Sequence, residues 1–388
     1  MSLSRPVAVY SSFLRNRARK PDTAPLVQHG IDRWTLELAA ALAQCGQRVD
    51  LLVKTDRLPP SDRMPLPEGV RLVKVGRTRL RSFWSLLHYV YRERPRAVIG
   101  GLRFANLQLL QLKRLCGARA VLILTVHDHV GTRLAALGER RRKAYLRELR
   151  RYACADAVVC VSEGVRSDLV AHVELPPARM LTVYNPVRVP PCDQPRGSDD
   201  GLRIVLGVGR LGPDKGFDRL VDAFALLAAD PSLRLVICGT GVESVAVDLR
   251  RHIAARGLQD RVDLPGHVDE IGCWYRRAAV FVLSSRTEAL PYVLLEALAC
   301  GAPVVAFDCP TGPAEILDGG RFGRVVPNGD VAALAAAISA ALDDPGNADE
   351  RRERARQFDP AHIADTWLRL IDELSVAAQP QPVRDLLA

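Results

Sequence analysis

Short apolar runs alternate with segments of helical periodicity along most of the chain. In the first half, each run is four to six residues long, and all but the last precede a segment in which apolar residues recur every three to four positions. Continuous apolar strands that alternate with helices are typical of a parallel sheet covered on both faces. The predicted strands are Val7–Tyr10, Val49–Val53, Ala97–Gly100, Ala120–Thr125, Ala157–Val161 and Leu181–Tyr184, and the predicted helices are Trp34–Cys45, Ser82–Tyr91, Asn106–Leu115, Arg140–Ala153 and Gly164–Ala171.

A stretch with four prolines, residues 185–201, interrupts this pattern and predicts a linker. The alternation then restarts, with strands expected at Arg203–Gly207, Arg234–Cys238, Arg261–Leu264, Val280–Leu283, Pro303–Phe307 and Gly323–Val326, and helices at Phe217–Ala229, Glu243–Ala255, Asp269–Arg277, Pro291–Ala299, Pro313–Leu317 and Val331–Leu342.

The expected fold is therefore α/β, with two Rossmann-like doubly wound domains that face a cleft. The expected boundaries are residues 1–187, a linker over 188–201, and a second domain over 202–360. Residues 361–388 form a last helix and tail, which we expect to cross back to the first domain. In such sheets ligands bind at the carboxyl ends of the strands.

The composition excludes several classes of protein. The longest apolar run, Val331–Leu342, is too short for a membrane span, and no secretory signal is visible at Met1–Tyr10. The nine cysteines contain no CxxC pair, so neither a zinc site nor a disulfide framework is expected, which suits the reduced thiols of a cytosol. The eight histidines form no HExxH motif, and no metal is expected.

The charge is divided unevenly between the two halves. Residues 1–200 contain 34 lysines and arginines against 18 acidic residues, a balance of +16, which leaves −6 for residues 201–388 out of a total of +10. This asymmetry indicates that the first half faces a polyanion: nucleic acid, an anionic membrane surface or an anionic substrate.

Two glycine turns follow strands of the second half. In residues 207–216, glycines including Gly209 allow close approach to a ligand, and Arg210 and Lys215 supply two cations that suit a diphosphate. A tight turn with two solvated cations is the alternative. The second turn contains Gly239 and Gly241 and is alone a weak signal, since many strand-to-helix turns look alike.

Two glutamates accompany the strand that ends near Ser284. Glu288 lies in the loop that follows the strand, and Glu296 lies more than one turn inside the next, mostly apolar helix. A carboxylate on an apolar helix needs a partner, and the hydroxyls of a sugar or ribose would serve. The alternative is that Glu288 caps the helix and Glu296 pairs with an arginine.

Together these segments resemble the family-4 retaining glycosyltransferases of the GT-B fold, as found among bacterial lipopolysaccharide and exopolysaccharide enzymes. The resemblance rests on Glu288 and Glu296 with seven residues between them, on the two glycine turns, and on the segments 266–268, 311–316 and 326–330. In the first half it is looser: the segment 30–33 resembles the family's glycine loop, and His127 follows a strand where the family has a histidine near the sugar.

The resemblance implies roles for individual residues. Arg210 and Lys215 would neutralise the donor diphosphate in place of a metal, Glu296 would hold ribose hydroxyls, Glu288 would face the donor sugar, and His127 would touch the sugar or orient the acceptor. The catalytic set is thus Glu288, His127, Arg210 and Lys215. The implied donor-binding residues are Gly30, Gly209, Arg210, Lys215, Gly239, Gly241, Val268, Glu288, Leu290, Tyr292 and Glu296.

The resemblance also implies the reaction. A sugar would move with retention from a nucleotide-diphosphate sugar, with UDP favoured over GDP, to a glycan or lipid-linked acceptor in cell-surface polysaccharide biosynthesis. No cofactor, metal or nucleic acid would be required, and the enzyme would be cytoplasmic or peripheral on the inner face of the membrane. An NDP-sugar epimerase or phosphorylase of the same build is the main alternative; a nucleic-acid-binding protein rests on charge alone.

Two stretches carry much of the positive charge of the first half. Residues 77–92 combine basic flanks with aromatic residues, for which we favour an ordinary core helix before the strand at Ala97; residues 139–151 form a basic helix that is either a solvated face or a membrane contact. We hypothesise that this half docks on an anionic membrane surface and meets the acceptor there.

Overall fold

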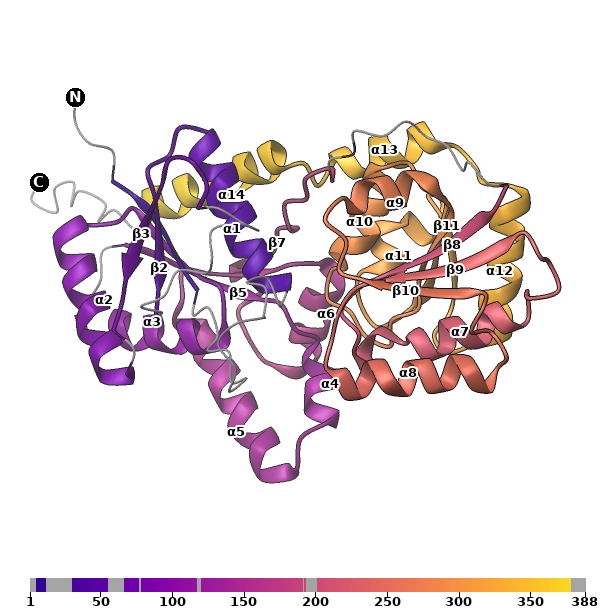
Figure 1. Ribbon diagram of the computed structural model, residues 1–388. Coiled ribbons are helices and arrows are strands. Elements are labelled where there is room, and N and C mark those ends of the chain that lie inside the picture. The colour runs from indigo at the N-terminus through magenta and orange to yellow at the C-terminus, as the bar shows by residue number, and fades with distance from the viewer. Residues whose placement is uncertain are drawn as a thin grey trace, which may run out of the picture. The chain divides into compact units, whose positions relative to one another are not determined.

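The computed structural model (Figure 1) describes residues 5–11, 30–54, 66–76, 78–116, 120–190, 192 and 201–377. The chain divides into two compact units. The first comprises Met1–Val161, Arg166–Pro186 and Pro360–Ala388, and the second comprises Ser162–Val165 and Val187–Asp359. Most of the predicted linker lies outside the described residues.

The first unit is built on a seven-stranded, fully parallel sheet of order β3-β2-β1-β4-β5-β6-β7. The order reverses at β1, whose Val7 pairs with Val49 on one side and Ala97 on the other. The strands are β1 Val7–Tyr10, β2 Val49–Val53, β3 Val70–Lys74, β4 Ala97–Gly100, β5 Val121–Val126, β6 Ala157–Cys160 and β7 Met180–Thr182, and the helices are α1 Gly30–Gln44, α2 Arg79–Glu93, α3 Arg103–Cys116, α4 Val130–Ala135, α5 Glu139–Arg150, α6 Glu163–His172 and α14 Pro360–Ala377.

The C-terminal helix α14 completes this first unit. It packs on α1, where the rings of Trp34 and Trp367 lie 6.5 Å apart between centroids, and each tryptophan is 1% exposed. Leu38 of α1 and Ile371 of α14 are fully buried nearby. Burial of such large side chains contributes about 1.5–3 kcal/mol each, so α14 is an integral part of the unit.

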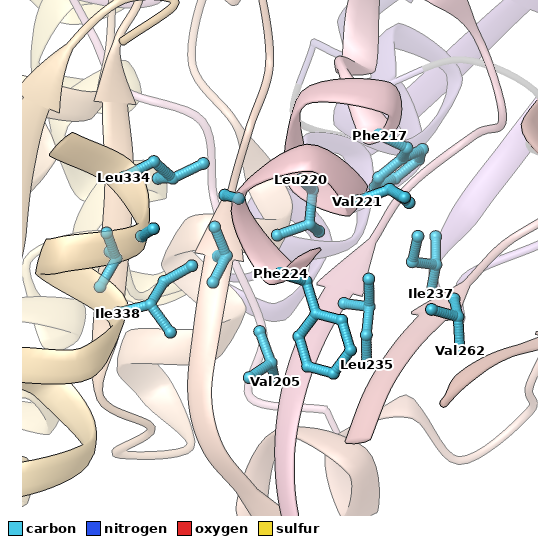
Figure 2. Packing of buried hydrophobic residues seen from close by; sticks show 14 of the residues in the cluster. Val205, Phe217, Leu220, Val221, Phe224, Leu235, Ile237, Val262, Leu334 and Ile338 are labelled. Atoms are coloured by element: carbon cyan, nitrogen blue, oxygen red, sulfur yellow. The ribbon is translucent and has the colours of Figure 1, made fainter. Parts of the chain in front are cut away.

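The second unit is built on a six-stranded, fully parallel sheet of order β10-β9-β8-β11-β12-β13. Figure 2 shows its core, where Phe217, Leu220 and Phe224 of one helix face lie over Val205 and Leu235 of the sheet. The strands are β8 Arg203–Val208, β9 Leu233–Cys238, β10 Val262–Gly266, β11 Ala278–Leu283, β12 Val304–Asp308 and β13 Arg324–Pro327, and the helices are α7 Phe217–Ala225, α8 Glu243–Ala255, α9 Ile271–Arg277, α10 Tyr292–Ala299, α11 Pro313–Ile316, α12 Val331–Asp343 and α13 Ala348–Arg356.

The predicted fold class, two Rossmann-like parallel-sheet domains, is confirmed. Three elements were missed, and one of them is the six-residue helix α4. The edge strand β3 has one buried residue followed by exposed and half-buried ones, so it lacks an apolar run, and α13 is almost entirely polar with only Arg351 buried.

The expectation that the chain has no disulfide is wrong for one pair of cysteines. Cys192 and Cys273 form a disulfide, with their Cα atoms 4.9 Å apart, and the bond joins the start of the second unit to α9. The two residues are 81 positions apart, a separation that carries no recognisable spacing signal. Among the described helices, none is long and apolar enough to cross a membrane.

Candidate functional site

The candidate site of the second unit lies where β8, β9 and β10 end side by side. The N–H of Gly239 donates to the carbonyl of Gly266 at 2.7 Å, and the N–H of Gly209 donates to that of Cys238 at 3.0 Å. A Cβ on Gly239 would lie 1.8 Å from the Gly209 carbonyl oxygen, and a Cβ on Gly241 would lie 2.1 Å from that of Leu211. Both glycines are therefore required by backbone contact, which lets the two turns pack directly against each other.

Lys215 and Glu288 meet at this edge. The Lys215 Nζ lies 2.6 Å from Glu288 Oε1, and their side chains are 21% and 10% exposed. The hydroxyl of Ser285 donates to the same carboxylate oxygen at 2.6 Å. The Lys215 side chain also runs beside Gly209, since its Cγ and Cδ lie 3.8 Å from where a Gly209 Cβ would be. The structure thus joins the predicted cation to the predicted acid, 73 residues apart in sequence.

The turn before Lys215 is braced by two further ion pairs. Arg210 donates to Asp214 Oδ1 at 2.7 Å and is 44% exposed. Arg286 pairs with Asp218 at 2.5 Å and donates to the carbonyl of Pro213 at 2.7 Å. The Arg286 guanidinium holds the pKa of Asp218 below its usual range despite the opposing effect of burial. The anchored turn leaves Arg210 at the surface, where an anion can reach it.

The loop that carries Glu288 is held from the opposite side by Thr311. The Thr311 hydroxyl donates to the Glu288 carbonyl, and Gly312 has a φ of 95°, a conformation that favours glycine. A Cβ on Gly312 would lie 2.8 Å from the Pro291 Cδ. The supporting roles of Thr311 and Ser285 were missed by sequence reasoning, although Thr311 lies in one of the segments that carry the resemblance.

Glu296 is placed differently from Glu288. It lies on α10 at 3% exposure, and the Tyr275 hydroxyl donates to its Oε2 at 3.0 Å. A carboxylate on an apolar helix needs a partner, and a tyrosine of α9 supplies at least part of what Glu296 needs. Leu290 and Tyr292, at the start of the same helix, are 5% and 8% exposed. Val268 lies two residues beyond the end of β10. The ligand-binding roles of these residues stay predictions.

The candidate residues of the first unit are Gly30 and His127. Gly30 is the exposed first residue of α1, and His127 directly follows β5. The ring of Trp34 meets the His127 imidazole edge-on with centroids 4.5 Å apart.

The tautomer of His127 follows from its neighbours. Thr125 Oγ1 lies 2.6 Å from the carbonyl oxygen of Gly100 and 2.8 Å from His127 Nε2. A carbonyl can only accept, so the single hydroxyl proton of Thr125 points to Gly100, and Thr125 must accept from the imidazole. His127 therefore carries its proton on Nε2 and keeps a lone pair on Nδ1. Burial lowers the pKa of His127 to about 3, which keeps the ring neutral at physiological pH.

Other perturbed groups lie near these positions. Burial raises the pKa of Asp32, in the first turn of α1, to about 6, and raises the pKa of the Cys309 thiol to about 12. In the described part of the chain, no three His, Cys, Asp or Glu side chains gather in a way that could hold a metal ion.

Two family profiles match successive parts of the chain. The profile described as "Glycosyltransferase Family 4" matches residues 29–189, and the profile described as "Glycosyl transferases group 1" matches residues 192–358.

Individual relatives show the same similarity. The D-inositol 3-phosphate glycosyltransferase of Pseudarthrobacter chlorophenolicus is 28% identical, with 89% of each chain covered. The exopolysaccharide phosphotransferase of Streptomyces coelicolor is 34% identical over 65% of this chain, which spans only 27% of that protein's length. Among solved structures, Anabaena HepE in complex with UDP and glucose has a TM-score of 0.76 at 17% identity, covering 95% of this chain and 99% of HepE. The sheets, the paired glycine turns and the two matching profiles agree, and the chain belongs to the group 1, family-4 glycosyltransferases of the GT-B fold.

Proposed function

We propose that the protein is a retaining glycosyltransferase that moves a sugar from a nucleotide-diphosphate sugar to a glycan or lipid-linked acceptor in cell-surface polysaccharide biosynthesis. The observation that carries this proposal is the contact of 2.6 Å between Lys215 and Glu288 above two glycine turns. It brings a cation suited to phosphate beside a carboxylate suited to hydroxyls.

The donor would enter at the carboxyl edge of the second sheet. Its diphosphate would take Lys215 and Arg210 as counter-charges, because glycines at 209 and 239 let phosphate oxygens approach the backbone. As Lys215 turns toward phosphate, Glu288 would keep the Ser285 hydrogen bond and accept hydroxyls of the donor sugar. Glu296 would contribute to ribose binding on the same helix.

The two cations would act most strongly when the bond to the leaving diphosphate breaks, because negative charge then grows on it. We favour UDP as the nucleotide, and the UDP in the HepE complex supports this choice. His127, neutral and with a lone pair on Nδ1, would accept a hydrogen bond from a sugar or acceptor hydroxyl. Catalysis would take place in the cytoplasm, with the enzyme peripheral on the inner face of the membrane.

A panel of nucleotide sugars, with membrane extract as the acceptor and nucleotide release as the readout, tests the proposal. Lys215→Ala and Glu288→Gln should each lower transfer at least a hundredfold, on the order of the loss of one electrostatic stabiliser. Lys113→Ala is the matched control, since Lys113 forms an ion pair of similar burial with Asp156 in the first unit and should leave turnover unchanged. Full turnover in Lys215→Ala or Glu288→Gln would refute the assigned site.

Two further measurements test retention of configuration and the epimerase alternative. The anomeric configuration of the product, read by NMR, should equal that of the donor, and inversion would refute retention. Donor incubated without acceptor should stay unchanged, whereas conversion to another nucleotide sugar would indicate an epimerase.

A further inference from the structure

The helix α2 exposes an apolar stripe to solvent. Leu80, Trp84 and Tyr91 are 68%, 60% and 78% exposed, and at 100° per residue they lie within about 40° of one another around the helix. The Phe83 ring packs edge-on against Trp84 with centroids 5.8 Å apart. α2 is the core helix expected before β4, since Leu86 is fully buried and Tyr89 is 5% exposed, and the stripe lies on the opposite side of the same helix.

The inward face of α2, which buries Leu86, also makes polar contacts. The Tyr89 hydroxyl donates to the fully buried carboxylate of Asp50 at 2.7 Å. Gln108 of α3 donates to the Ser82 hydroxyl at 2.6 Å, and Tyr10 of β1 donates to Gln108 at 2.6 Å. These specific bonds fix the rotation of the helix about its axis, so its apolar stripe faces outward as part of the fold.

Positive charge borders this stripe without compensation from the helix itself. Arg81 and Arg92 are exposed, and each follows a stripe residue by one position, so both lie on the same flank. The one acidic residue of α2 is Glu93, which pairs with Arg48 at 2.8 Å and with Arg71 at 3.0 Å. Glu93 therefore leaves the flanking arginines uncompensated.

The basic helix α5 lies on the same side of the sheet. The chain moves from β3 to β4, from β4 to β5 and from β5 to β6 in one direction through α2, α3 and α5, whereas α1 leads from β1 to β2 in the other. Right-handed crossovers place the first three helices on one face and α1 on the opposite one, as Figure 1 shows. The exposed cations of α5 are Arg140, Arg141, Arg142, Lys143, Arg147 and Arg150.

We infer that this face, which we term the α2–α5 face, lies on a bilayer of anionic lipids, with Leu80, Trp84 and Tyr91 inserted among the headgroups and the arginines bound to lipid phosphates. An exposed apolar stripe that contains tryptophan and tyrosine and is bordered by cations is typical of a helix that lies in a membrane interface. Nucleic acid would match the charge but would leave Leu80 unexplained. This assignment extends the lipid-linked acceptor proposed above, on which it partly rests.

Co-sedimentation of the full-length protein with vesicles is the test. Vesicles of 70% phosphatidylcholine and 30% phosphatidylglycerol should bind the protein, and pure phosphatidylcholine vesicles should bind it at least tenfold more weakly. Each cation removed should lower the affinity about fivefold, so that Arg81→Glu with Arg92→Glu lowers it at least 25-fold at low salt. Equal binding to both vesicles, or none, would overturn the inference.

A matched set of variants tests the apolar stripe. Serine at Leu80, Trp84 and Tyr91 should lower binding at least tenfold. Serine at Leu226, Val242 and Val376, which are 62%, 65% and 71% exposed and lie outside the α2–α5 face, should leave binding unchanged. Equal loss in both sets, or no loss in the first, would refute a role for the stripe, and binding to a DNA duplex in place of vesicles would assign the face to nucleic acid.

Two measurements keep this result separate from the proposed activity. Brominated lipid should quench tryptophan fluorescence in the wild type, and the quenching should fall sharply in Trp84→Phe while vesicle binding persists. UDP binding, followed by calorimetry, should be unaffected in every stripe variant. A protein that binds vesicles but not UDP would contradict only the proposed glycosyltransferase activity. A protein that binds UDP but not vesicles would contradict only the proposed membrane contact of the α2–α5 face.

Discussion

Protonation of His127 should destabilise the first unit at mildly acidic pH. The imidazole is packed against Trp34 and donates to Thr125, and burial lowers its pKa to about 3. An unfolded chain takes up the proton near pH 6.5, so between these values the unfolded state binds more protons than the folded state. Stability should therefore fall as the pH falls through 6.5.

The size of the effect follows from the two pKa values. His127 titrates at about 6.5 in the unfolded chain and near 3 in the folded one, so its protonation can lower the free energy of unfolding by at most about 5 kcal/mol. At pH 5 the free energy of unfolding should already be lower by about 2 kcal/mol. The difference in unfolding free energy between the wild type and His127→Gln should thus change by about 2 kcal/mol between pH 7.5 and pH 5.

Proton NMR of the imidazole resonances measures this directly, with the His127→Gln spectrum identifying the His127 line. The line should not shift between pH 8 and pH 5, and denaturant unfolding followed at the first unit should show the change in stability. A His127 midpoint near pH 6.5, together with parallel stability curves for wild type and variant, would refute the tautomer and burial reasoning.

Two further changes probe the two units. Gly239→Ala should abolish measurable UDP binding by calorimetry, because its Cβ would lie 1.8 Å from the Gly209 carbonyl oxygen. Gly138→Ala is the control, since its Cβ would have no atom within 4 Å, and it should bind UDP as the wild type does. Normal binding by Gly239→Ala would remove that turn from the donor site. Asp50→Asn should destabilise the first unit by about 2 kcal/mol in thermal unfolding, because the buried carboxylate that accepts from Arg71 at 2.6 Å and from Tyr89 at 2.7 Å would lose its charge, while Arg71 keeps Glu93 as a partner. A change below 1 kcal/mol would show that the pair is dispensable.

The meeting of Lys215 and Glu288 at one edge was predictable because their signals are local. Lys215 and Glu288 each follow a strand within a few residues, and parallel strands bring their carboxyl ends to one edge. The 2.6 Å contact between them could not be read from the sequence, but their common edge could. The burial of Glu296 against Tyr275 was not foreseen, because α9 and α10 carry no sequence signal of their packing.

The orientation of α2 could not be predicted from periodicity. Apolar residues lie on both sides of this helix, and the side that turns inward buries Leu86 and carries the groups that bond to Asp50 and Gln108 on other elements. The edge strand β3 was missed for a related reason, since only its first residue is buried. Periodicity reports where apolar residues fall and not which partners they meet.

The inclusion of α14 in the first unit has a consequence for synthesis on the ribosome. Trp34 of α1 is covered by Trp367, a residue made after the whole second unit has been translated. The usual order, in which the N-terminal domain folds first, cannot be completed here. The second unit has all its residues once Asp359 has emerged, whereas the first keeps an open apolar face on α1 until the last helix is released. The N-terminal unit is therefore the last to be finished, and a chain truncated before Pro360 would display that face permanently.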